Sequence, residues 1–485
     1  MAGELRDSVA RGVAWSVAEK IGTMLLQAGV SIVVLRLLMP DDFGVIAVLT
    51  AFAAFALAVV DSGFSQTLIR RPDPAPQDYR AVFFFNIAAS VGAYFLLVGL
   101  APVVASFYGM PVIVRLAPVF FLLLPVNALC VIQHTIFTRQ FRFDLLSKIT
   151  FVSSLVSGLF AIGLAAAGCG VWALVAQRVS QMAVRALLLW SLSEWRPQGG
   201  GLCFVPLRSM APYSFSLLAS DLISAVYNKI PQLFIGRLYS ADTLGFFDQA
   251  VKLKDLPLTS AMTAVQGVTF PALARISDSG PKFAESYRQV VSVVAYVLFP
   301  VMLGLSAVSE DLFVALLGSK WLPTVPYFRT ICFAGLFYPV AMVAYNILKV
   351  RCSGPEIFRL EIIKKVGMTL ILVLTIPRSV QAVVWGLVVF SFFEMTVNVG
   401  ASLRVSELSA RRFLRTLLPV VFVSAVMFFC VRGVSLFSPE AGVLRLCIRI
   451  FVGVGVYLLL SALFRLEAFS ACLSICRRQF GFHQK

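Results

Sequence analysis

Charged residues are scarce in this sequence. Only 13% of its 485 residues are charged and 59% are apolar, and the mean hydropathy is +0.89. An ordinary soluble domain has about 25% charged residues, so this composition excludes one and indicates a polytopic membrane protein. The N-terminal segment MAGELRDSVARG lacks a signal-peptide cleavage pattern, and we therefore expect the first apolar helix to remain in the mature chain.

Acidic residues are the scarcer of the two charged classes. The chain has 24 Asp and Glu against 41 Lys and Arg, which gives a formal net charge of +17. In a soluble protein this excess would suggest a nucleic-acid partner. In a membrane protein most of it marks cytoplasmic loops, so no nucleic acid is implied.

The residue types that carry most enzyme chemistry are also rare or poorly placed. There are two histidines, His134 and His483, and the nine cysteines are scattered without metal-ligand spacing. No paired carboxylates, nucleotide-binding glycine loop or metal cluster can be recognised. We therefore expect a protein that is not an enzyme, and we expect no metal and no cofactor.

Long apolar runs, by contrast, are abundant. A helix needs about 20 apolar residues to cross the hydrocarbon core, and fourteen such windows lie at roughly 13–36, 44–61, 81–105, 113–135, 144–167, 170–191, 211–236, 244–270, 289–308, 325–348, 358–377, 381–402, 413–431 and 442–464. The polar segment SEWRPQGGGLCFVPLR separates the sixth from the seventh and has the composition of a linker.

These windows predict an all-α integral membrane protein with about 14 transmembrane helices. Two six-helix lobes would surround a central cavity, followed by two C-terminal helices. The predicted domains are an N-terminal lobe (1–195), a cytoplasmic linker (196–208), a C-terminal lobe (209–405), and a final helix pair with a basic cytoplasmic tail (406–485).

Basic residues set the orientation. If the N-terminus is cytoplasmic, the loops on that side carry about four times as many Lys and Arg as the loops on the other side. This asymmetry supports an even number of spans, with both termini in the cytoplasm.

The two halves contain an internal repeat. At a constant offset of 201 residues, RLLMPDDFG (36–44) aligns with RLYSADTLG (237–245), and the preceding helices align without a gap. Because six predicted spans separate the copies, both have the same orientation. A parallel repeat predicts pseudo-symmetry about the membrane normal, with the functional cavity between the lobes.

Ionisable residues inside the predicted spans are candidates for function, because charge at bilayer depth costs several kcal/mol unless it faces protein or water. Basic residues predominate even there, which favours an anionic substrate, phosphate in particular. The expected cationic cavity is lined by Lys20, Arg178, Arg185, Lys229, Lys252 and Lys254. Its expected polar partners are Glu19, Asp61 and Asp255. Its expected cytoplasmic mouth carries Arg70, Arg71, Lys364 and Lys365.

Some of these charges also have simpler interpretations. Glu361 precedes Lys364 and Lys365 by three and four residues, so an intrahelical ion pair is an alternative to a cavity role. Arg70 and Arg71 follow the second span and help to set topology. Arg445 and Arg449 lie near one end of the last span, where we expect them to snorkel to the interface.

The order of several short motifs resembles a known family. The motifs RGVAWSVAEKIG, LRLLMPDDFGVIAVL, VDSGFSQTLIRR, GVWALVAQ, LGFFDQAVKLKDLP, GVTFPALARISD, KWLPTVP and FRLEIIKK occur between residues 8 and about 420. Together they are similar to the polysaccharide transport family of the multidrug/oligosaccharidyl-lipid/polysaccharide exporters. Within it, the Wzx-like flippases for lipopolysaccharide O-antigen and colanic acid are most similar.

The resemblance implies a flippase of the bacterial inner membrane, and we expect it to be a monomer. Its cargo would be an undecaprenyl-pyrophosphate-linked oligosaccharide, its surroundings membrane lipid, and its further partners the downstream polymerase and chain-length proteins. Two alternatives stay open at this point. One is a cation-coupled multidrug exporter of the same superfamily, which would favour acidic cavity residues. The other is a membrane O-antigen ligase or polymerase.

Overall fold

The computed structural model describes residues 22–61, 63–71, 73–197, 205–276, 280–434 and 442–470. Within these ranges the chain is helical and contains no β-strand. It divides into two compact units, Met1–Gly245 and Phe246–Lys485. The lobe and linker limits predicted from the sequence stay a prediction.

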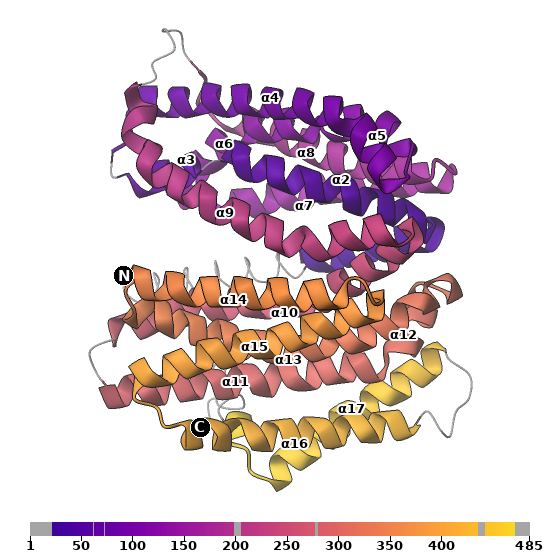
Figure 1. Ribbon diagram of the computed structural model, residues 1–485, viewed down its shortest axis with the longest axis vertical. Helices are drawn as coiled ribbons and strands as arrows, with labels where there is room; N and C mark the ends of the chain where they lie inside the picture. Colours follow the sequence, from indigo (N-terminus) through magenta and orange to yellow (C-terminus); the bar gives the residue numbers. More distant parts are fainter. Residues whose placement is uncertain are drawn as a thin grey trace, which may run out of the picture. The chain divides into compact units, whose positions relative to one another are not determined.

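The first unit is a helical bundle (Figure 1). Residues 22–37 form a helix, which is followed by α2 (Pro40–Asp61), α3 (Phe64–Arg70), α4 (Pro76–Tyr108), α5 (Val112–Phe120), α6 (Leu123–Arg139), α7 (Phe143–Ala166), α8 (Val171–Leu192) and α9 (Val205–Leu238). Helix α9 packs against α2, α3 and α4. The break between α5 and α6 lies four residues before Pro125, which has no N–H to bond to the carbonyl of Phe121.

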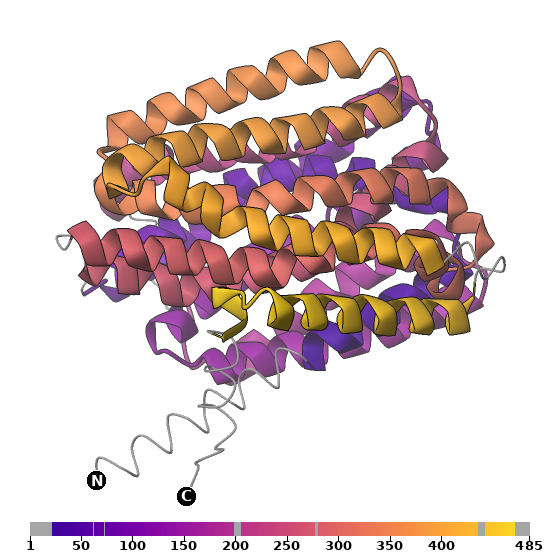
Figure 2. The same cartoon turned by 90° about the horizontal axis from the view of Figure 1, so that it is seen from below.

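Helix α10 (Ala241–Arg275) begins in the first unit and continues into the second. The second unit then contains α11 (Gly280–Ala307), α12 (Ser309–Leu316), a 3₁₀ turn (Ser319–Thr324), α13 (Val325–Arg351), α14 (Gly354–Thr375), α15 (Val380–Ser406), α16 (Ala410–Val434) and α17 (Val443–Leu463). Helix α13 packs against α11 and α15, and α17 packs along α16 (Figure 2). The unit's main core surrounds Phe283, Tyr287 and Met302.

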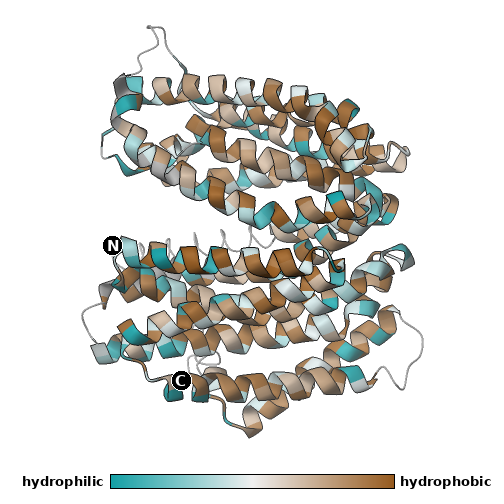
Figure 3. Ribbon diagram, viewed as in Figure 1, coloured by the Kyte–Doolittle hydropathy of each residue, from teal (hydrophilic) through white to brown (hydrophobic). Residues whose placement is uncertain are grey.

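Hydropathy separates the long helices into two groups. Nine described segments are long and apolar enough to span a membrane, and Figure 3 shows the prevalence of apolar residues along them. Helices α8, α9, α10 and α14 are not among the nine, although each has at least 22 residues. At about 1.5 Å per residue they are long enough to cross a hydrocarbon core of about 30 Å. The total of fourteen spans stays a prediction.

The repeat found in the sequence reappears as a contact between its two copies. A Cβ atom added to Gly44 would lie 2.0 Å from the carbonyl oxygen of Ala241, and one added to Gly245 would lie 2.0 Å from that of Pro40. The offset of 201 converts each contact into the other. The starts of α2 and α10 therefore meet backbone to backbone, at a separation that only glycine permits at both positions.

The two copies also begin their helices in related ways. The Asp42 carboxylate accepts a hydrogen bond from the backbone N–H of Met39 at 3.1 Å. At the equivalent positions of the second copy, the Ser240 hydroxyl accepts one from the N–H of Thr243 at 3.2 Å. These are the two halves of a capping box. The first copy satisfies the backbone N–H before the helix, and the second copy satisfies the N–H three residues further on.

Candidate functional site

Among the described lysines of the predicted site, Lys364 on α14 is the most deeply buried. Its side chain is 4% exposed, and its Nζ lies 2.5 Å from Glu361 Oε1 and 3.6 Å from Glu394 Oε1 on α15. The same ammonium lies 4.7 Å from the ring centre of Tyr345 on α13. Three helices therefore converge on one buried charge. The intrahelical ion pair with Glu361 that the sequence offered as an alternative is confirmed.

Two further lysines surround this group. Lys349 Nζ lies 4.6 Å from the Tyr345 ring centre and interacts electrostatically with Glu361 and Lys364. Lys365 interacts electrostatically with Glu394. Three lysines and two glutamates give this cluster, which we call the α14 network, a formal charge of +1. The sequence identified Lys364 and Lys365 but not the contributions of Lys349 and Glu394.

A second polar group lies in the first unit. Asn127 Nδ2 on α6 donates to Asp61 Oδ1 at the end of α2, at 3.3 Å. Asp61 interacts electrostatically with Arg185 on α8 and with Asp221 on α9. His134 on α6 also lies within the electrostatic reach of Arg185. The structure thus brings together Asp61 and Arg185, which the sequence treated separately.

Helix α8 also carries Arg178, which is exposed, while Arg185 is half-buried. Gln181, between them, donates to Ser154 Oγ on α7 at 3.2 Å. Gln27, on the helix formed by residues 22–37, donates to the same oxygen at 3.1 Å. The polar face predicted for α8 is therefore directed partly into the bundle. Lys229 is half-buried on α9.

Both lysines of α10 form ion pairs with aspartates of the same helix. Lys252 forms an ion pair with Asp248 at 2.5 Å, and Lys254 forms one with Asp255 at 2.7 Å. Asp248 is buried whereas the Lys252 side chain is 44% exposed. Each lysine therefore has its own carboxylate, and no additional positive charge arises from these two pairs.

The predicted mouth residues of the first unit belong to a braced turn after α3. Arg71 forms an ion pair of 3.2 Å with Asp78, whose other role is to accept the N–H of Ala75 at the start of α4. Arg139 Nη1 donates to the carbonyl oxygens of Leu68 and Arg71, both at 2.6 Å. Arg70 is exposed at the end of α3. Glu19 and Lys20 lie outside the described residues.

The prediction that Arg445 and Arg449 snorkel to the interface is wrong. Both guanidinium groups are buried and bind Asp311 on α12, which is fully buried. Arg445 Nε donates to Asp311 Oδ1 and Arg449 Nη1 to Oδ2, each at 2.6 Å. Arg449 Nε also donates to the carbonyl of Val431 at 3.1 Å. A buried carboxylate, and not the membrane interface, therefore compensates the charge of these arginines.

Sequence comparisons place the chain in a family. Residues 33–326 match the family described as polysaccharide biosynthesis protein, and the chain belongs to that family. It is 26% identical to the teichuronic acid biosynthesis protein TuaB of Bacillus subtilis over 84% of this chain and 85% of that protein. It is 25% identical to the succinoglycan biosynthesis transport protein ExoT of Rhizobium meliloti, over 75% and 73%. It is 23% identical to the lipopolysaccharide biosynthesis protein WzxC of Escherichia coli, over 74% and 73%.

The fold is shared with solved transporters. The structure of a lipid II flippase, MurJ, in an inward closed conformation matches with a TM-score of 0.71 and 12% identity, over 93% of this chain and 98% of that one. An inward-facing multidrug resistance transporter of the MATE family matches with a TM-score of 0.59 and 16% identity, over 79% and 95%. The predicted all-helical membrane fold is confirmed.

Proposed function

We propose that this protein is a flippase that moves a polyprenyl-pyrophosphate-linked oligosaccharide from the cytoplasmic to the periplasmic leaflet of the bacterial inner membrane. The family and the names of its relatives support a role in polysaccharide biosynthesis and transport. The observation that carries the proposal is the position of the charges. Helices α8, α9, α10 and α14, which fall outside the nine apolar segments, carry eight of the thirteen predicted site residues.

The proposed mechanism is alternating access. Lysines and arginines on these helices would bind the pyrophosphate, because a guanidinium or ammonium forms strong charge-assisted hydrogen bonds with phosphate oxygens. The glycan would occupy an aqueous cavity while the polyprenyl chain stays in lipid. Rocking of one lobe against the other would then expose the headgroup to the periplasm.

Reconstitution tests this function. The purified protein is placed in liposomes that contain a fluorescent, defined undecaprenyl-pyrophosphate oligosaccharide, and the headgroup's accessibility to an external quencher or glycosidase is followed. We expect headgroup translocation to exceed that of protein-free liposomes. Transport of a cationic dye without glycan translocation would instead identify a multidrug exporter. Transfer of the glycan to an acceptor would identify a ligase or polymerase.

The α14 network gives a prediction for this assay. Replacing Lys364 by methionine should lower translocation at least about tenfold, because the loss of one charged hydrogen bond of about 1.5–3 kcal/mol is enough for such a change. The substitution also leaves the half-buried carboxylates of Glu361 and Glu394 without their ammonium partner. Lower translocation alone would therefore not separate transport from folding.

The double variant Lys364→Met with Glu361→Gln separates the two roles. It removes one charge of each sign and restores the charge balance, so thermal stability should recover towards that of the wild type. Translocation should stay low if the ammonium acts in transport. Recovery of both quantities would show that Lys364 only neutralises Glu361.

A further inference from the structure

A basic pocket lies in the second unit, away from the α14 network. It is formed by the first turns of α11, the first half of α16 and the segment that follows α17, and its cavity has a volume of about 520 Å³. Its charged lining consists of four arginines and two glutamates: Arg288, Arg412, Arg415, Arg465, Glu285 and Glu467. The formal charge of the lining is therefore +2. Charge asymmetry places these residues on the side that we expect to be cytoplasmic.

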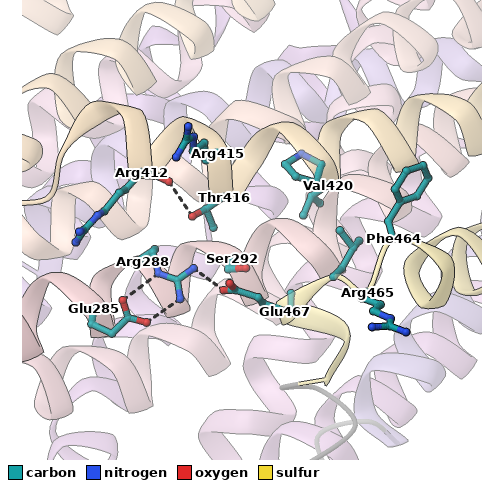
Figure 4. Close-up of a pocket in the computed structure, with 13 residues that line it drawn as sticks. Glu285, Arg288, Ser292, Arg412, Arg415, Thr416, Val420, Phe464, Arg465 and Glu467 are labelled. Atoms are coloured by element: carbon teal, nitrogen blue, oxygen red, sulfur yellow. Dashed lines mark hydrogen bonds and ion pairs between the residues drawn. The ribbon is translucent and has the colours of Figure 1, made fainter.

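One arginine holds both carboxylates (Figure 4). Arg288 binds Glu285 through Nη2 at 2.7 Å and Nε at 3.0 Å, and it binds Glu467 through Nη1 at 2.6 Å. Both acidic groups of the pocket are thus directed to a single guanidinium. In the described part of the chain, the structure gives no ion pair within 4.0 Å for Arg412, Arg415 or Arg465. Arg412 interacts with Glu285 only at longer range, so three guanidinium groups without a direct ion pair are left to attract an anion.

Arg465, in the turn after α17, has an unfavourable backbone conformation. Arg465 has a φ of 48°, a left-handed conformation usually taken by glycine at the end of a helix. The turn is closed by hydrogen bonds from Arg465 N to Ala462 O at 3.2 Å and from Leu466 N to Ser461 O at 3.1 Å. Leu466 and Ala468 then anchor the segment in a buried cluster. An arginine at this position adds positive charge to the pocket where glycine would fit the backbone better.

The rest of the lining is apolar or hydroxylated, and α16 also has exposed apolar residues that do not line the pocket. Ser292 and Thr416 provide hydroxyl groups, while Val420 and Phe464 provide apolar surface. Along α16, Leu414, Leu418 and Phe422 are each more than half exposed. A ligand that suits this surface has a phosphate at one end and acyl chains at the other.

We propose that this pocket binds the phosphate of an anionic phospholipid of the cytoplasmic leaflet, with the acyl chains lying along α16. Arginine suits this role because its planar guanidinium pairs with phosphate oxygens at two points. The lipid would join α16 to the segment after α17. The proposal is independent of what the protein transports, since binding is measured without transport.

The test measures binding of a fluorescent short-chain phosphatidylglycerol to the purified full-length protein in neutral detergent, by anisotropy. The double variant Arg412→Gln, Arg415→Gln should bind about tenfold more weakly or worse, because each charge-assisted hydrogen bond to phosphate contributes enough for a change of this size. The matched control is Arg404→Gln, Arg411→Gln. It removes the same charge from nearby exposed arginines that do not line the pocket, and it should retain wild-type affinity.

A second variant keeps the test valid if the first one folds poorly. Arg465→Gly removes a charge from the pocket and also relieves the left-handed backbone strain. We expect it to lower the affinity for phosphatidylglycerol while the melting temperature without lipid is unchanged or raised. A parallel loss of affinity and stability would contradict the proposal.

Competition separates the possible sources of the phosphate. Unlabelled phosphatidylglycerol should displace the probe, whereas phosphatidylcholine and inorganic pyrophosphate at equal concentration should not. Equal loss of affinity in the pocket and control variants would reduce the effect to general surface attraction and overturn the proposal. Displacement by a short-chain polyprenyl pyrophosphate but not by phosphatidylglycerol would assign the pocket to the cargo and also overturn it.

Discussion

Replacing Asp311 by alanine is expected to destabilise the second unit by about 3–5 kcal/mol, the usual effect of removing one partner from a buried ion pair. The variant leaves the buried guanidinium groups of Arg445 and Arg449 without their shared carboxylate. Because Asp311 is on α12 and the arginines are on α17, the variant should also loosen the last helix. Thermal unfolding in detergent measures the first effect, and protease sensitivity of the segment after α16 measures the second.

Two further variants test the cause of this instability. Glu310→Ala removes an exposed carboxylate beside Asp311 and should change stability by less than about 0.5 kcal/mol, as most surface substitutions do. The triple variant Asp311→Leu, Arg445→Met, Arg449→Met removes all three buried charges and should recover most of the lost stability, since apolar groups can replace a buried ion network. If Asp311→Ala melted like the wild type, the arginines would have another source of stabilisation.

The ion pairs of Asp311 with Arg445 and Arg449 could not be predicted from the sequence. The spacing of Arg445 and Arg449 places them on one helix face, but it does not identify what covers that face. Their carboxylate is 134 and 138 residues away in the chain. Their position near one end of the last span favoured the interface. A partner at such a distance becomes visible only when the packing of α12 against α17 is known.

Contacts between residues close together in the sequence were easier to predict. The Lys364–Glu361 pair spans less than one helical turn, so the periodicity of α14 was enough to predict it. Glu394 and Tyr345, which complete the α14 network, come from α15 and α13, and no short-range pattern links them to Lys364. The helical membrane fold followed from composition, and the repeat followed from a single offset. The helical fold and the repeat can both be predicted from the sequence without knowledge of tertiary contacts.

The contact between the repeat copies leads to the second large effect. Gly44→Ala is expected to destabilise the protein by about 2–3 kcal/mol, although alanine is normally the better helix residue. The added Cβ would lie 2.0 Å from the carbonyl oxygen of Ala241, and a backbone oxygen cannot turn aside as a flexible side chain can. The starts of α2 and α10 would have to separate. Thermal unfolding of the purified variant measures the change.

Gly92→Ala on α4 is the matched control. A Cβ atom added there meets nothing within 4 Å, so the same substitution should stabilise the protein by up to about 1 kcal/mol through helix propensity. The opposite signs at Gly44 and Gly92 would separate close packing from any general effect of replacing glycine. Equal stabilisation at both positions would show that the contact yields without cost.

Because the contact between the repeat copies is symmetric, the equivalent substitution at Gly245 can be predicted as well. Gly245→Ala should have an effect close to that of Gly44→Ala, because its Cβ would meet the carbonyl oxygen of Pro40 at the same distance of 2.0 Å. The double variant should destabilise by less than the sum of the two, since the separation forced by one Cβ also makes room for the other. Strictly additive effects would mean that the two halves of the contact yield independently, and the repeat copies would then not form one rigid contact.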